Sequence, residues 1–109
     1  DHTDVKFIQK SQKFVAIHAE RRNTDRSRIR VWESEDGITF TKGDLVQGDL
    51  RKGVINAGMS GDGCGHVRVG VQQFLSYAHS DPPREWGRWF TWFQPLDWPE
   101  SEPDGSGEL

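Results

Sequence analysis

The sequence predicts an all-β fold made of two similar sheet modules. Twelve glycines and five prolines in 109 residues, without a sustained helical periodicity, favour many short strands joined by turns. Apolar and polar residues alternate from Arg28 to Trp32, as they do along a pleated strand. Only 33% of the residues are hydrophobic, which is a low fraction for a chain that must bury a core of its own.

Strands can be assigned in order from alternating runs and from runs that are apolar on both faces. The expected strands lie within residues 5–9, 13–19, 27–40 (a hairpin), 41–49, 66–71, 73–79 and 88–94. Asp36-Gly37 suits a two-residue hairpin turn, so Ile38, Thr39 and Phe40 are expected to begin the second strand. Leu50 to Gly65 is expected to be irregular.

Residues 99–109 have the acidic composition, rich in Gly, Ser and Pro, of a flexible C-terminal tail. The rest of the chain, residues 1–98, is expected to hold all of the strands.

The two halves of the chain resemble each other. Trp32 and Trp92 are 60 positions apart (92 − 32), and other aromatic and arginine positions match at the same offset. Repeats of about 40–50 residues with four strands are typical of propeller blades, and longer loops account for the difference. We therefore expect two propeller-type blades of three or four antiparallel strands, at about 1–58 and 59–98. Two blades cannot close a ring, so the chain is expected to be part of a larger or oligomeric β-propeller.

Charge and composition disfavour several kinds of partner. The net charge is -3 and the pI is about 5.8, so nucleic acid is not expected to bind. No apolar run approaches the roughly 20 residues of a membrane span, so no membrane partner is expected. Cys64 is the only cysteine, and the histidines lack the spacing of a zinc site. No cofactor is expected, apart from a structural cation near His66, and a secreted or extracytoplasmic location is favoured.

Residues 34–40, Ser-Glu-Asp-Gly-Ile-Thr-Phe, resemble a turn of five-bladed propeller glycosidases of the arabinanase and fructosidase type. That turn has the pattern Ser-x-Asp-Gly-x-x-aromatic, and it is also similar to the Asp-box of sialidases, where the glycine lies one residue further from the aspartate. The resemblance covers about residues 5–98 and implies the C-terminal portion of such a protein. It further implies that the serine and aspartate bond backbone groups of the hairpin.

The same resemblance implies a site with paired carboxyl groups, which hydrolyses glycosides in the complete ring. Asp62 and Glu20 are the catalytic candidates, and Asp4 and Asp25 are further carboxyl candidates. The alternative is that Asp62 shapes a glycine-rich turn and that Glu20 and Asp25 pair in solvent with a loop arginine, which would be Arg21, Arg22 or Arg26.

Substrate-binding candidates are the residues that could stack on a sugar ring or bond its hydroxyls. They are His66, Trp86, Arg88 and Arg28. The expected partners are carbohydrate and further blades, supplied by the same parent protein, by another chain or by self-association. Two alternatives remain open: a non-catalytic sugar-binding propeller, and a small self-contained β-sandwich that acts as an interaction module.

Overall fold

The computed structural model describes residues 3–46, 50–80 and 88–98, and in these residues the chain is all-β. The strands are β1 (Asp4–Ile8), β2 (Lys13–Glu20), β3 (Arg28–Ser34), β4 (Thr41–Leu45), β5 (Val54–Met59), β6 (His66–Val67), β7 (Gln73–Ser80) and β8 (Trp89–Leu96). No helix long and apolar enough to cross a membrane occurs in this part of the chain. The predicted tail, 99–109, lies outside the described residues.

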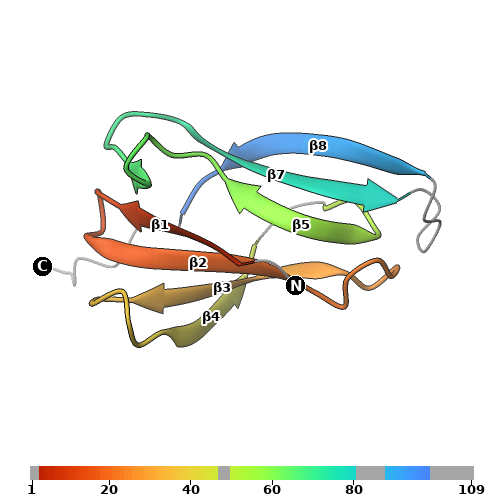
Figure 1. The fold of residues 1–109 in the computed structure, drawn as a ribbon, viewed down its shortest axis with the longest axis horizontal. Coiled ribbons are helices and arrows are strands. Elements are labelled where there is room, and N and C mark those ends of the chain that lie inside the picture. Colours follow the sequence, from red (N-terminus) through yellow and green to blue (C-terminus); the bar gives the residue numbers. More distant parts are fainter. Residues whose placement is uncertain (1–2, 47–49, 81–87, 99–109) are drawn as a thin grey trace, which may run out of the picture.

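The strands form two sheets that lie one above the other (Figure 1). The first sheet has the order β4-β3-β2-β1-β6, in which β1 to β4 form an antiparallel meander and β6 pairs in parallel with β1. The second sheet has the order β5-β7-β8 and is antiparallel. The predicted all-β class is therefore confirmed, and no closed propeller is formed by the described residues.

Two segments differ from the sequence-based expectation. β5 lies in the segment that was expected to be irregular, so that expectation is wrong for these residues. The strand is irregular within itself: Asn56 has φ of +54°, and the register with β7 shifts between Ile55 and Gly58, which breaks the alternating pattern. β5 also spans the expected division at residue 58 and pairs with β7. β6 is only two residues long and joins the first sheet, so the boundary between the sheets does not coincide with the boundary between the sequence halves.

The hairpin between β3 and β4 also differs, because its turn is longer than predicted. Ser34 Oγ accepts a hydrogen bond from the Gly37 N–H (2.9 Å), and Asp36 Oδ1 accepts from the N–H groups of Ile38 (2.8 Å) and Thr39 (2.9 Å). Residues 38–40 are therefore part of the turn, and the prediction that they begin a strand is wrong. The expected bonding of the serine and aspartate to the hairpin backbone is confirmed.

Ser34→Ala is expected to lower the free energy of unfolding by about 1–2 kcal/mol. Ser34 is buried, and the alanine would leave the Gly37 N–H without its acceptor. Denaturant unfolding monitored by tryptophan fluorescence measures the change. Glu35→Ala, at an exposed position of the same turn, is the control and should change little. Equal losses in the two variants would contradict this role of Ser34.

A single hydrophobic interior lies between the two sheets. Ile17 and Ile29 contribute from the first sheet, and Val54, Leu75 and Tyr77 contribute from the second, each with at most 2% of its surface exposed. The interior therefore depends on both halves of the sequence, and neither sheet encloses it alone.

The outer face of each sheet, directed away from this interior, is also rich in apolar side chains. On the first sheet Val5 lies opposite Ala16, and Ala16 lies opposite Trp32. On the second sheet Phe74 and Phe93 are 44% and 67% exposed. A sandwich that is complete by itself usually carries polar residues on its outer faces, so these two surfaces need an explanation.

Candidate functional site

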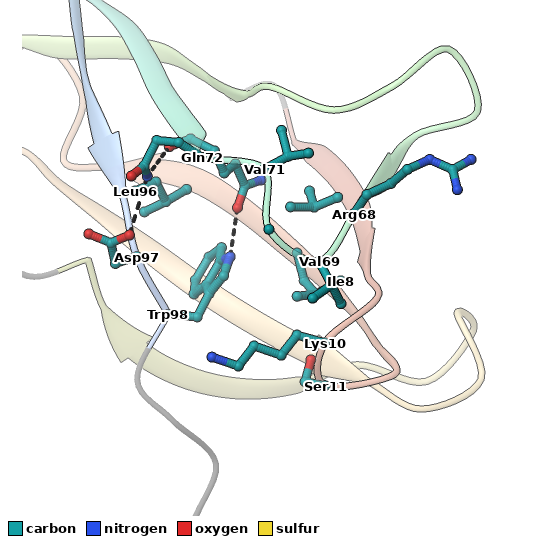
Figure 2. Close-up of a pocket in the computed structure, with 13 residues that line it drawn as sticks. Ile8, Lys10, Ser11, Arg68, Val69, Val71, Gln72, Leu96, Asp97 and Trp98 are labelled. Carbon is teal, nitrogen blue, oxygen red and sulfur yellow. Dashed lines mark hydrogen bonds between the residues drawn. The ribbon is translucent and has the colours of Figure 1, made fainter.

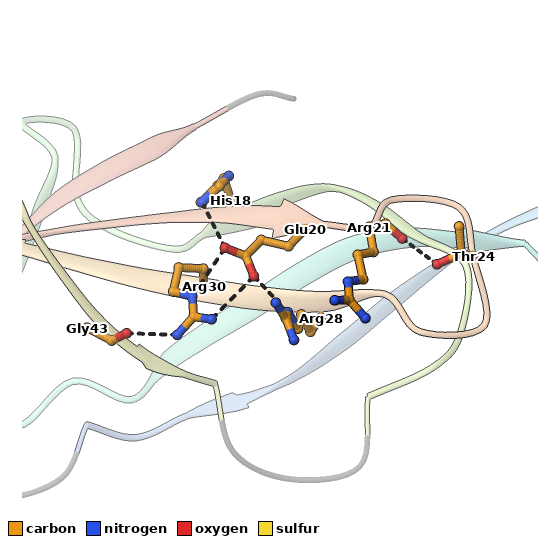
Figure 3. Close-up of polar contacts among 7 residues, drawn as sticks. All are labelled: His18, Glu20, Arg21, Thr24, Arg28, Arg30 and Gly43. Carbon is orange, nitrogen blue, oxygen red and sulfur yellow. Dashed lines mark hydrogen bonds and ion pairs between the residues drawn. The ribbon is translucent and has the colours of Figure 1, made fainter.

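The carboxylate of Glu20 lies between two arginines at the end of β2, on the outer face of the first sheet (Figure 3). Arg28 Nε donates to Oε1 (2.7 Å), and Arg30 Nε donates to Oε2 (3.2 Å). Arg30 is fixed further by a hydrogen bond from Nη1 to the Gly43 carbonyl (3.0 Å). His18 Nε2 lies 3.9 Å from Oε2. Strand pairing produces this cluster, because Glu20 lies opposite Arg28 and His18 lies opposite Arg30.

The protonation state of Glu20 follows from these contacts. Partial burial raises the pKa of the carboxyl, but hydrogen bonds from Arg30 and Arg28 outweigh that effect, so the pKa of Glu20 lies below its ordinary value. A general acid of a glycosidase needs a raised pKa. Glu20 is therefore suited to hold the two arginines and unsuited to protonate a leaving group.

The second catalytic candidate, Asp62, shapes the glycine-rich turn before β6. Its Oδ1 accepts hydrogen bonds from the N–H groups of Cys64 (2.8 Å) and His66 (3.0 Å), and its Oδ2 accepts from Arg68 Nε (2.8 Å). The backbone bonds from His66 and Cys64, with Arg68, lower the pKa of Asp62 to about 2. This is the structural role that the sequence left open as the alternative.

The structure does not bring Asp62 and Glu20 together. Asp62 lies in the turn before β6 and accepts from the N–H of His66, which pairs with Phe7, and Phe7 pairs with Phe14. Glu20 is six residues further along β2 than Phe14 (20 − 14), which corresponds to about 20 Å of strand. Paired carboxyl groups of glycosidases lie roughly 5–9.5 Å apart. The two candidates cannot act as such a pair within one copy of the chain.

The substrate-binding candidates are also separated from one another. His66 is exposed beside the Asp62 turn, with its ring 5.3 Å from that of Phe7. Arg28 is held by Glu20, and Arg88 is exposed next to the start of β8. Trp86 lies outside the described residues. Within the described part of the chain, no group of three or more His, Cys, Asp or Glu side chains could hold a metal ion.

Of the further carboxyl candidates, Asp4 connects the two sheets. Its Oδ2 accepts a hydrogen bond from the Met59 N–H in β5 (2.6 Å), and its Oδ1 pairs with Lys6 (2.8 Å). Asp25 is exposed in the loop between β2 and β3. Asp4 therefore has a structural contact that the sequence did not predict.

Asp62→Asn is expected to lower the free energy of unfolding at neutral pH. The gap in unfolding free energy between this variant and the unmodified chain should shrink as the pH falls from about 4 to about 2. The pKa of Asp62 is lower in the folded chain than in the unfolded chain. The ionised carboxylate therefore contributes stability above the unfolded pKa, and this contribution is lost as the pH falls through the folded pKa. Denaturant unfolding of both proteins across this range measures it. A difference that stays constant with pH would contradict the contribution of the charge.

A pocket of about 550 Å³, which the sequence did not reveal, opens at one end of the two sheets (Figure 2). Its walls come from the β1–β2 turn, the segment between β6 and β7, and the end of β8. Ile8, Lys10, Ser11, Gln72, Asp97 and Trp98 are among the residues that line it. These segments are far apart in the sequence, so no local motif could have predicted the pocket.

Comparisons with known proteins identify no relative. No family model, curated protein or solved structure matches the chain.

Proposed function

We propose that the chain forms two neighbouring sheets of a β-propeller that binds carbohydrate, and that further sheets cover its outer faces. The observation that supports this most is an apolar area on each outer face, with Val5 and Trp32 on one side and Phe74 and Phe93 on the other. The charged cluster around Glu20 takes up only the end of the first of these faces. In a propeller each sheet packs against a neighbour on both faces, so both faces must be apolar.

The hairpin turn supports the same architecture. Ser34 and Asp36 bond the turn backbone as the resemblance to propeller glycosidases implies. The meander of β1 to β4 has the four antiparallel strands expected of a blade.

Binding is better supported than hydrolysis. Asp62 and Glu20 lie at opposite ends of the first sheet, and both have lowered pKa values. If the complete assembly hydrolyses glycosides, at least one of the two carboxyl groups therefore comes from another position or from another chain.

A self-contained β-sandwich that serves as an interaction module is the second candidate. It is favoured by the single interior, to which both sheets contribute fully buried side chains such as Ile17 and Leu75. In that case the two apolar outer faces would bind protein partners rather than further sheets of a ring.

A glycan array probed with the fluorescently labelled full chain tests the proposed function. Retention of at least one class of glycan, without release of reducing sugar, is the expected result. Absence of binding to every glycan would contradict carbohydrate binding. Release of reducing sugar by the chain alone would contradict the conclusion that it only binds.

A further inference from the structure

We infer that the end pocket is the carbohydrate site and that it takes one neutral sugar ring stacked against Trp98. This inference rests on the proposed function, because it assumes that the chain binds sugar. It places the site at a position that differs from every candidate taken from the sequence.

The indole of Trp98 is held in a fixed orientation. Trp98 Nε1 donates to Gln73 Oε1 (2.7 Å), and Gln73 Nε2 donates to the Ser60 carbonyl (3.1 Å). Gln73 is only 4% exposed, so its amide is a buried link between the indole and the segment after β5. Because the ring is already fixed, a ligand that stacks on it loses little additional side-chain freedom.

The pocket combines an apolar surface with polar groups near its opening. Ile8 and Leu96 are both buried and line it from the two sheets. Val69 and Val71, which are 62% and 64% exposed, add apolar surface from the segment between β6 and β7. Figure 2 shows these apolar side chains and Trp98 around the same pocket.

The polar groups suit hydroxyls. Gln72 Nε2 donates to Asp97 Oδ1 (3.2 Å) and to the Gln73 carbonyl (2.8 Å), which leaves its carbonyl oxygen and the second Asp97 oxygen as potential acceptors. Ser11 and Lys10 line the opposite side. The charged residues of the lining are Lys10, Arg68 and Asp97. Arg68 forms an ion pair with Asp62 (2.8 Å), and Lys10 and Asp97 have opposite charges, which favours a neutral ligand over an anion.

A sugar ring has the matching chemistry. It presents a face of C–H groups that packs on an indole and an edge of hydroxyls that bond amides and carboxylates. The volume of about 550 Å³ lies within the range of about 300–1,000 Å³ that is usual for small-molecule sites. A lipid tail would match only the apolar part of the lining and would form no hydrogen bond with Gln72, Asp97 or Ser11.

The test follows the Trp98 indole N–H in nuclear magnetic resonance spectra of the ¹⁵N-labelled full chain, titrated with a panel of neutral methyl glycosides. At least one glycoside should shift this signal in a saturable way. Trp98→Ala should weaken its binding about tenfold or more, and Trp98→Phe should retain most of it. Gln72→Ala leaves the indole ring in place and should weaken binding several-fold. It therefore tests the pocket even if a Trp98 variant does not fold.

The outcomes separate this inference from the proposed function. If glycosides bind but perturb residues around Arg28, and Arg28→Ala rather than Trp98→Ala abolishes binding, the end pocket is not the site and carbohydrate binding stands. If glycosides bind with equal affinity to the unmodified chain, to Gln72→Ala and to Trp98→Ala, and do not shift the Trp98 signal of the unmodified chain, the inference is also wrong. If no glycan binds on the array or in the titration, the proposed function itself fails.

Discussion

Leu75→Ala is expected to lower the free energy of unfolding by about 2–5 kcal/mol. Leu75 in β7 is completely buried between the two sheets, so the truncation removes apolar contacts and leaves a cavity in the shared interior. Equilibrium unfolding in urea, followed by circular dichroism and by tryptophan fluorescence, measures the change. The two probes should report a single coincident transition, because both sheets depend on the same interior.

Phe93→Ala is the matched control for this substitution. Phe93 is 67% exposed on the outer face of the same sheet, so at a protein concentration too low for self-association its truncation should change the free energy of unfolding by only about 0.5 kcal/mol. Similar losses for Leu75 and Phe93, or two separate transitions, would contradict the shared interior.

Gly53→Ala is expected to lower the free energy of unfolding by about 2–5 kcal/mol, because a strained backbone conformation and a steric clash act at one position. Gly53 has φ of +70°, a conformation that L-amino acids with a side chain rarely adopt. An alanine Cβ would also collide with the Ser80 side chain and come within 3.0 Å of the Ser80 carbonyl oxygen. Ser80 cannot move freely, because its hydroxyl donates to Asn23 Oδ1 (2.8 Å) in the loop after β2.

Gly63→Ala provides the comparison, since a Cβ at that position meets no atom within 4 Å. This variant should unfold at nearly the same urea concentration as the unmodified chain. If Gly53→Ala were as mild as Gly63→Ala, the close approach of Gly53 to Ser80 would not exist in solution.

Much of the fold could be predicted from local pattern. β2 and β7 are long runs with fully buried side chains, and their apolar content identified them directly. The turn around Asp36 was recognisable because serine, aspartate and glycine have fixed roles in bonding a hairpin backbone. β5 was missed because Asn56 and Gly58 interrupt its alternation, and only its pairing with β7 makes it a strand.

The candidate site was harder to predict, because it depends on tertiary contacts. The sequence suggested an arginine partner for Glu20 but placed it in the adjoining loop, whereas strand register brings Arg28 opposite Glu20 and the carboxylate pairs with Arg28 and Arg30. The distance between Glu20 and Asp62 could not be read from the sequence, since it depends on β6 pairing with β1. The end pocket combines Lys10, Gln72 and Trp98 from three segments, and no local spacing connects them.

The apolar outer faces give the account its most direct test, which is the mass of the purified full chain by light scattering. Where no other chain is present, copies must cover these faces, so we expect an assembly of at least two copies, with a mass well above the 12.5 kDa of one chain. Phe93→Asp, which places a charge on one outer face, should return the chain to the mass of a single copy. A monodisperse species of 12.5 kDa from the unmodified chain would contradict the propeller proposal and favour the self-contained sandwich.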